Sequence, residues 1–127
     1  MILVQLPNIT QGFCVFSSTG AFTVAFSGLN ADFNGGTNFN MANATAAAAT
    51  DFIEYTVTFN NDFGNIFNAT NDAVASATFD TSGADQSCAL YGGPNSSIST
   101  AIDQPTFDAA ANNDSYSDVL TMLYTAI

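Results

Sequence analysis

The sequence predicts a single all-β domain folded as an antiparallel sandwich. Apolar residues alternate with polar ones in several segments, and clusters of Gly, Asn and Asp separate these segments. The chain has 127 residues, 47% of them apolar and twelve of them Phe, which is enough to form one hydrophobic core. Short strands divided by turn residues are typical of an antiparallel sandwich.

The first strand is predicted over residues 2–6, and Pro7 ends it. Its apolar residues Ile2, Val4 and Leu6 share one face. Because an apolar strand at the edge of a sheet is an aggregation hazard, we expect this segment to have a partner.

The next two strands are predicted to form a hairpin, because residues 13–16 and 22–26 flank turn residues at 17–20. Residues 53–59 give the clearest strand, with strict alternation of apolar and polar residues. The Ala-rich segment 46–49 has no amphipathic period and predicts a loop or a single helical turn. Further strands are predicted over residues 73–79, 97–102 and 116–126.

The last of these strands is apolar on both faces. A strand of this kind is buried on both faces, either in the centre of the fold or in an assembly. One face carries Leu120, Met122 and Tyr124, and the other carries Val119, Leu123 and Ile127.

The charge of the chain has one sign. Lys, Arg and His are absent, and eleven Asp and Glu residues give a net charge of −11. Binding to nucleic acid or to anionic lipid depends on Lys and Arg, so neither is predicted. The chain also lacks an imidazole base, a Schiff-base lysine and the His of a Ser-His-Asp triad.

No catalytic site is predicted from the carboxylates, and we expect the protein not to be an enzyme. Residues 79–83 depart from the aspartic-protease loop, which needs Gly directly after Thr and a second copy. The carboxylate pairs Asp51/Glu54 and Asp114/Asp118 lie at turn and strand boundaries, where Asp is an ordinary turn residue.

Calcium is the one cofactor that this composition could bind, because Ca²⁺ prefers oxygen ligands. None of the candidate groups has the spacing of a defined calcium loop, so solvated turns are preferred and no cofactor is predicted. The candidates are Asp32/Asn34, Asn60/Asn61/Asp62 and Asn112/Asn113/Asp114.

The two cysteines, Cys14 and Cys88, are expected to form a disulfide rather than remain free thiols. Closing so long a loop would add about 4 kcal/mol to the free energy of unfolding.

The Asn-, Thr- and Ser-rich composition favours an extracellular location. No apolar stretch is long enough to insert in a membrane, and residues 1–6 are too short for an export signal, so we expect a processed chain. Asn-x-Ser/Thr sequons, in slight excess over chance, begin at Asn8, Asn43, Asn68, Asn95 and Asn113.

Three stretches resemble secreted fimbrial proteins of Gram-negative bacteria. Residues 12–24 are similar to their Cys-Val-aromatic-Ser opening, and residues 53–62 to their central strand and the turn after it. The tail from Cys88 to Thr121, with Tyr116-x-Asp118, resembles the closing strands of spore-coat-U-like pilins of the archaic chaperone–usher pathway. The Gly that precedes the Tyr motif in that family is replaced by Asp114-Ser115.

This resemblance implies an incomplete immunoglobulin-like sandwich that is completed by a strand from the next subunit. Residues 1–12 would be an N-terminal extension that donates Ile2, Val4 and Leu6, and residues 13–127 would be the pilin-like domain. The implied partners are identical subunits, a periplasmic chaperone and an outer-membrane usher, and the implied product is an extracellular filament. The acceptor groove would be lined by Val15, Phe16, Leu120, Met122 and Tyr124.

Two alternatives stay open. Residues 2–6 could be the edge strand of a sandwich that is complete in itself. The protein could also be a secreted binding module for a sugar or another surface ligand, assisted by calcium, with Tyr91 beside Gly92-Gly93 as a stacking platform.

Overall fold

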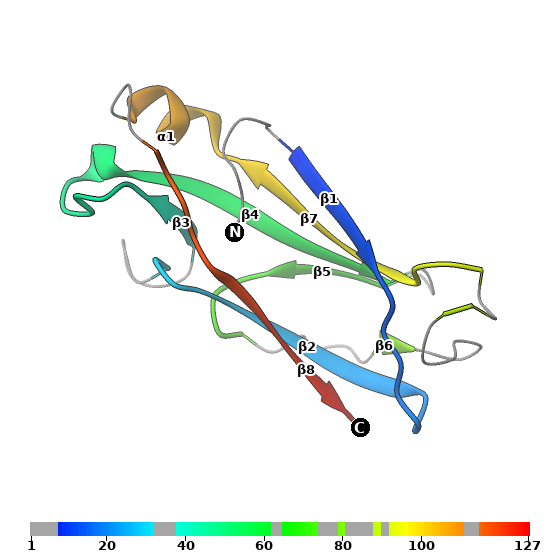
Figure 1. Ribbon diagram of the computed structural model, residues 1–127. Helices are drawn as coiled ribbons and strands as arrows, with labels where there is room; N and C mark the ends of the chain where they lie inside the picture. Colours follow the sequence, from blue (N-terminus) through cyan, green and yellow to red (C-terminus); the bar gives the residue numbers. More distant parts are fainter. Residues whose placement is uncertain are drawn as a thin grey trace.

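Two antiparallel sheets face each other in the computed structural model, which describes residues 8–31, 38–61, 65–73, 79–80, 88–89, 92–110 and 115–127 (Figure 1). The first sheet has the order β1-β7-β4-β3, with β5 also paired to β4, and the second has the order β6-β2-β8. The predicted all-β sandwich is therefore confirmed. The first sheet contains β1 (Asn8–Phe13), β7 (Ser96–Ile102), β4 (Phe52–Asn61), β3 (Phe39–Ala42) and β5 (Asn65–Ala69), and the second contains β6 (Phe79–Asp80), β2 (Ala21–Gly28) and β8 (Leu120–Ala126).

The central strand β4 follows from its alternating sequence. Ile53, Tyr55, Val57 and Phe59 are at most 2% exposed, while Thr56 between them faces outward. On one side β4 pairs with β7, and on the other its two halves pair with β3 and β5. The strand predicted over 53–59 is confirmed, and so is the strand predicted over 97–102, which forms β7.

Aromatic rings from both sheets form the centre of the core. Phe59 of β4 meets Phe79 of β6 edge to face at 4.8 Å between ring centroids, and Phe22 of β2 lies 5.5 Å from Phe79 and 6.1 Å from Phe59. Such tilted and edge-to-face pairs add to the free energy gained by burying the rings. Many of the twelve Phe residues thus hold the two layers together.

The predicted hairpin between residues 13–16 and 22–26 is wrong. The turn itself forms, because Gly20 N–H donates to the Ser17 carbonyl at 3.1 Å and Gly20 has a φ of +81°. However, β1 pairs with β7 in the first sheet and β2 pairs with β6 and β8 in the second. The turn therefore carries the chain from one layer to the other.

The expected boundary between residues 12 and 13 falls inside β1. Residues Asn8 to Phe13 all pair with β7, so residues 8–12 belong to the first sheet. A separate N-terminal extension would have to lie within residues 1–7, which are outside the described part of the chain.

The segment after β1 is fixed by a disulfide and by one amide side chain. Cys14 and Cys88 are bonded, with their Cα atoms 5.8 Å apart, which confirms the predicted pairing. Asn95 is fully buried, accepts from Val15 N–H at 2.9 Å and donates to the Val15 carbonyl at 2.9 Å. The side chain of Asn95 thus pairs with Val15 as a neighbouring strand would. This buried structural role explains why position 95 is Asn better than a glycosylation sequon does.

Two short helices accompany the sheets. The segment Ala49–Asp51 is a single 3₁₀ turn, as predicted for this region, and α1 (Gln104–Ala109) follows β7. Asp103 caps α1 by accepting from Thr106 N–H at 3.0 Å. Of the strand predicted over 73–79, residues 74–78 lie outside the described residues.

The loop that leads into β4 is organised around the carboxylate of Asp51, which is 8% exposed. It accepts from Ala48 N–H at 2.8 Å, from the Asn43 amide at 2.8 Å and from Ala47 N–H at 3.1 Å. These hydrogen bonds, led by that of Ala48, lower the pKa of Asp51 below its ordinary value of 3.8, against the opposing effect of burial.

This lowered pKa predicts how the loop responds to acid. The stability contributed by ionised Asp51 is fully present above 3.8 and is lost as the pH falls through the lower pKa of the folded state. The difference in melting temperature between the wild type and Asp51→Asn should therefore narrow as the pH is lowered from about 6 to about 2. Asp108→Asn, which removes the same charge from exposed α1, is the control. If the melting-temperature difference from the wild type narrowed equally for both variants, the stabilising role of ionised Asp51 in the loop would be contradicted.

Candidate functional site

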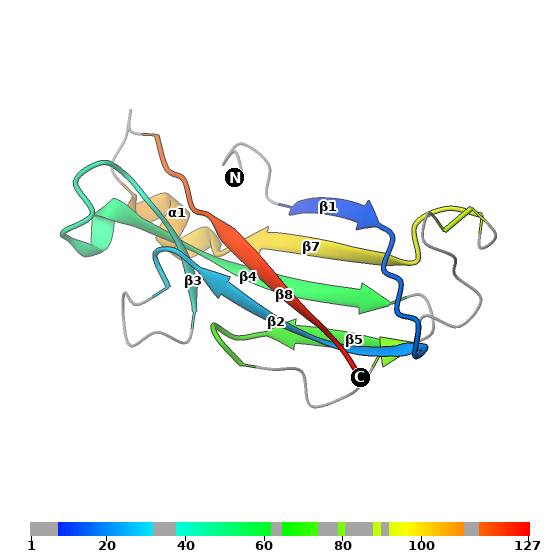
Figure 2. The same cartoon turned by 60° about the horizontal axis from the view of Figure 1, so that its bottom comes forward.

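The last strand, β8, lies at an edge of the second sheet. Its residues pair with β2 from Leu120 opposite Gly28 to Ala126 opposite Phe22, and no other described strand pairs with it. Figure 2 shows β8 beside β2. Of the two settings expected for this strand, the centre of the fold does not hold among the described residues, and burial in an assembly stays a prediction.

The inward face of β8 is only partly buried. Leu120, Met122 and Tyr124 pack against the core cluster, yet each keeps part of its surface exposed. Their neighbours on β2, Val24 and Phe26, are 1% exposed, although β8 is the one described strand that pairs with them and Phe26 adds a single bridge to Asn71. The β8 side chains are thus less buried than those of the strand beside them.

The outward face of β8 and the two residues that flank the strand carry exposed apolar side chains, which alternate with Thr121 and Thr125. Val119, Leu123 and Ile127 are 53%, 62% and 55% exposed, and they are three of the seven exposed large apolar residues in the described part of the chain. An edge strand with apolar residues on both faces is the kind of surface that proteins usually cover.

The segment after β1 meets the end of β8. The Tyr124 hydroxyl donates to the Phe16 carbonyl at 2.8 Å, and Phe16 is 37% exposed. Val15 is buried and paired with Asn95. Of the five residues predicted to line a groove, the structure thus brings Phe16 and Tyr124 together and places Leu120 and Met122 along the same strand. Their role as a groove stays a prediction, and Ile2, Val4 and Leu6 lie outside the described residues.

The Tyr116-x-Asp118 motif anchors the start of β8 to the opposite sheet. The Tyr116 hydroxyl donates to the Thr50 carbonyl at 2.8 Å. Asp118, 3% exposed, accepts from the Tyr55 hydroxyl of β4 and from both the backbone N–H and the amide of Asn30, each at 3.1 Å. The motif therefore fixes the position of the open edge relative to the core.

The hydrogen-bond partners of Asp118 are not evident from the sequence. Burial raises the pKa of Tyr55 far above its ordinary value of 10, and the Asp118 carboxylate raises it further, so Tyr55 remains a proton donor. Gly28 leaves room for the carboxylate, because a Cβ there would lie 2.9 Å from Asp118 Oδ2 and 3.1 Å from the Phe39 ring. No sequence spacing connects these residues, which come from segments far apart in the chain.

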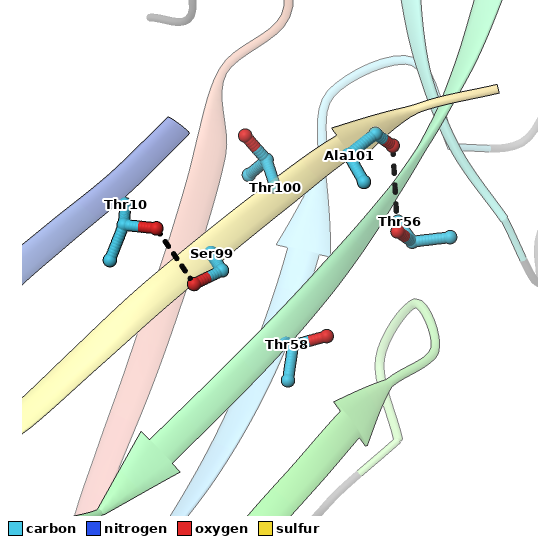
Figure 3. Close-up of a pocket in the computed structure, with 6 residues that line it drawn as sticks. All are labelled: Thr10, Thr56, Thr58, Ser99, Thr100 and Ala101. Atoms are coloured by element: carbon cyan, nitrogen blue, oxygen red, sulfur yellow. Dashed lines mark hydrogen bonds between the residues drawn. The ribbon is translucent and has the colours of Figure 1, made fainter. Parts of the chain in front are cut away.

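A shallow depression on the outer face of the first sheet is a second candidate site (Figure 3). It has a volume of about 250 Å³, and no charged or aromatic side chain lines it. The hydroxyls of Thr10 and Ser99 share a hydrogen bond of 3.1 Å, and the Thr56 hydroxyl donates to the Ala101 carbonyl at 3.4 Å. The lining residues are Thr10, Thr56, Thr58, Ser99, Thr100 and Ala101.

The calcium candidates receive no support from the described residues. Asn61 is fully buried and donates to the Ser96 hydroxyl at 3.3 Å, while Asn60 is exposed on the outer face of β4. Within the described part of the chain, no cluster of three Cys, Asp or Glu side chains is arranged to bind a metal ion. The remaining candidates, Asp32/Asn34, Asp62 and 112–114, lie outside it, as does Tyr91.

Neither described helix is long and apolar enough to cross a bilayer.

The contact between Tyr55 and Asp118 gives a prediction for stability. Tyr55→Phe removes the hydroxyl donor and leaves a buried carboxylate oxygen short of a partner, so unfolding should be easier by about 1–3 kcal/mol. Urea denaturation followed by circular dichroism measures this change. Tyr124→Phe is the matched control, because it removes a more exposed hydroxyl that donates to the Phe16 carbonyl. This variant should lose less stability. Equal losses in the two variants would show that Asp118 does not depend on Tyr55.

Comparison with known proteins supports the fold of this chain. No protein-family model and no curated protein sequence matches it. A solved structure described as a chaperone–tip adhesin complex in the biogenesis of CFA/I fimbriae contains a similar chain, with a TM-score of 0.61 and 11% sequence identity. The likeness covers 94% of this chain and 34% of the other, so this chain spans about a third of the length of that one. The chain therefore shares the β-sandwich fold of a part of that chain.

Proposed function

We propose that this protein is a structural subunit of an extracellular, fimbria-type filament, assembled by strand donation between identical copies. The observation that carries the proposal is the open edge of β8, whose inward residues Leu120, Met122 and Tyr124 remain partly exposed. The sandwich fold shared with a protein of a fimbrial chaperone–adhesin complex agrees with this function.

A strand that pairs with β8 would satisfy two needs at once. Its backbone would bond to the N–H and C=O groups on the side of β8 with which no described strand pairs, and its alternating side chains would cover the partly exposed core. In this sequence Ile2, Val4 and Leu6 have the required alternation. Each such side chain contributes about 1.5–3 kcal/mol when it becomes fully buried.

Before assembly, the same edge would need protection. An exposed apolar edge strand promotes uncontrolled association, and a chaperone that lends a strand prevents it. The periplasmic chaperone and the outer-membrane usher implied by the sequence resemblance are therefore part of this proposal, as is the location on the cell surface.

The proposal predicts that one buried position of the donated strand controls assembly. Val4→Asp places a charge among the apolar side chains that the edge would bury, so the full chain should no longer form filaments while its circular dichroism stays unchanged. Negative-stain microscopy and size-exclusion chromatography measure assembly.

Gln5→Asp is the matched control, because the neighbouring side chain points to the opposite face of the same strand. It adds the same charge and should leave filaments intact. Filaments of normal length from Val4→Asp would contradict strand donation by residues 2–6.

A second function is favoured by the hydroxyl-lined depression in Figure 3. Its uncharged hydroxyls suit a neutral sugar, and the net charge of −11 disfavours an acidic one. If the protein is a binding module, a neutral glucose oligosaccharide should shift the NMR signals of the depression, and Thr58→Val should weaken binding several-fold. Thr125→Val, on the outer face of the other sheet, is the control. Absence of any shift would dismiss this function.

A further inference from the structure

The fold divides the Asn-x-Ser/Thr sequons of the chain into buried and exposed ones. Asn43 and Asn95 are 7% and 0% exposed. The side-chain nitrogen of Asn43 donates to Asp51 at 2.8 Å, and that of Asn95 donates to the Val15 carbonyl at 2.9 Å. Because the core leaves no space around these two nitrogens, the folded chain has no room for a sugar on either of them.

The sequon that begins at Asn68 is placed differently. Asn68 lies near the end of β5 and is exposed, and among the described strands β5 pairs with β4 alone. Its neighbours Phe67 and Ala69 pack against the core. Since side chains alternate along a strand, this packing turns Asn68 to the outer face of the first sheet.

The reactive atom of this sequon is accessible as well. The Asn68 side-chain oxygen accepts from the Thr58 hydroxyl of β4 at 3.3 Å, and no described residue accepts from the side-chain nitrogen. Thr70, the hydroxyl residue of the sequon, follows β5 directly and is also exposed. An enzyme that recognises Asn-x-Thr can therefore reach both side chains in the folded protein.

From this arrangement we infer that Asn68 is a glycosylation site and carries a sugar on its side-chain nitrogen. In the transfer, this nitrogen forms a bond to the anomeric carbon of a sugar that is activated as a diphosphate ester. The bond between that carbon and the diphosphate breaks, and the diphosphate leaves with the bonding electrons. The nitrogen loses one proton to a base of the transferring enzyme.

The position of this site is compatible with the proposed assembly and does not depend on it. Asn68 lies on the first sheet, whereas β8 belongs to the second, so a sugar at Asn68 leaves the edge of β8 open. The sugar would also cover Ile66, which is 67% exposed and lies two residues away on the same face. A hydrated group would thus replace an exposed apolar surface at the outer end of β5.

Mass spectrometry of the full chain, isolated from the cells that naturally produce it, tests the inference. Chymotrypsin should be used, because the chain has no Lys or Arg at which trypsin could cleave. We expect the peptide with Asn68 to carry the added mass of one or more sugars, and the peptides with Asn43 and Asn95 to carry none. An unmodified Asn68 would overturn the inference, and a sugar on Asn43 or Asn95 would overturn its basis in burial.

Variants produced in the same cells show whether the sequon is responsible. Asn68→Gln and Thr70→Ala should both lose the sugar, whereas Thr70→Ser keeps the sequon and should retain it. Asn60→Gln is the matched control, because Asn60 is exposed on the same face but belongs to no sequon, and this variant should stay glycosylated. A sugar that persists on Asn68 in Thr70→Ala would contradict recognition of the sequon. Filament formation is measured separately and decides only the proposed function.

Discussion

The absence of any positively charged side chain is the constraint on which the described structure depends. Every carboxylate that folding removes from water must find neutral donors, because no ion pair with a side chain is available. Asp118 uses a tyrosine hydroxyl and an asparagine, Asp51 uses an asparagine and two backbone N–H groups, and Asp103 uses the first turn of α1. Within the described residues, no buried side-chain oxygen or nitrogen lacks a hydrogen bond. The many Asn, Thr and Ser residues are thus part of how an acidic chain forms a core.

These donors also determine where the open edge lies. Asp118 can be buried only where Tyr55 and Asn30 converge and where Gly28 leaves space, so the start of β8 has one position relative to β4. From that start, β8 pairs with β2 along the edge of the second sheet. A carboxylate that is hydrogen-bonded in the core therefore places an apolar strand at the edge, and the tail motif has a structural role that its spacing alone does not reveal.

Sequence patterns predicted the elements whose two faces differ. The strand β4 was predicted correctly because one of its faces packs on the core and the other faces solvent, so its residues alternate between apolar and polar. The strand β3 was missed, since all four of its residues are buried and Asn40 interrupts the apolar pattern. The helix α1 was missed although Asp103 and Pro105 form a usual helix start. The false hairpin shows the limit of turn residues, which predict a reversal of the chain and not the sheet in which the next strand pairs.

The candidate site was predictable in part for the same reason. Alternation identified Leu120, Met122 and Tyr124 as one face of a strand, but whether a second strand covers them depends on contacts between residues far apart in the sequence. The contact of Tyr124 with Phe16 joins residues 108 positions apart, and no local pattern encodes it. The same holds for strand direction, which depends on how the whole chain is wound.

A chain with one sign of charge can still associate with itself if the contacts involve no charge. Backbone hydrogen bonds and apolar side chains meet this condition, and the described part of β8 carries neither Asp nor Glu. At physiological salt, repulsion between carboxylates farther apart than about 8 Å is largely screened, so the remaining repulsion between copies acts only at short range. Strands that pair along an uncharged edge make their contacts at such short distances without bringing carboxylates of that edge together. The exclusion of ionic contacts therefore favours the proposed pairing of strands between copies, in which the register comes from backbone hydrogen bonds and apolar side chains.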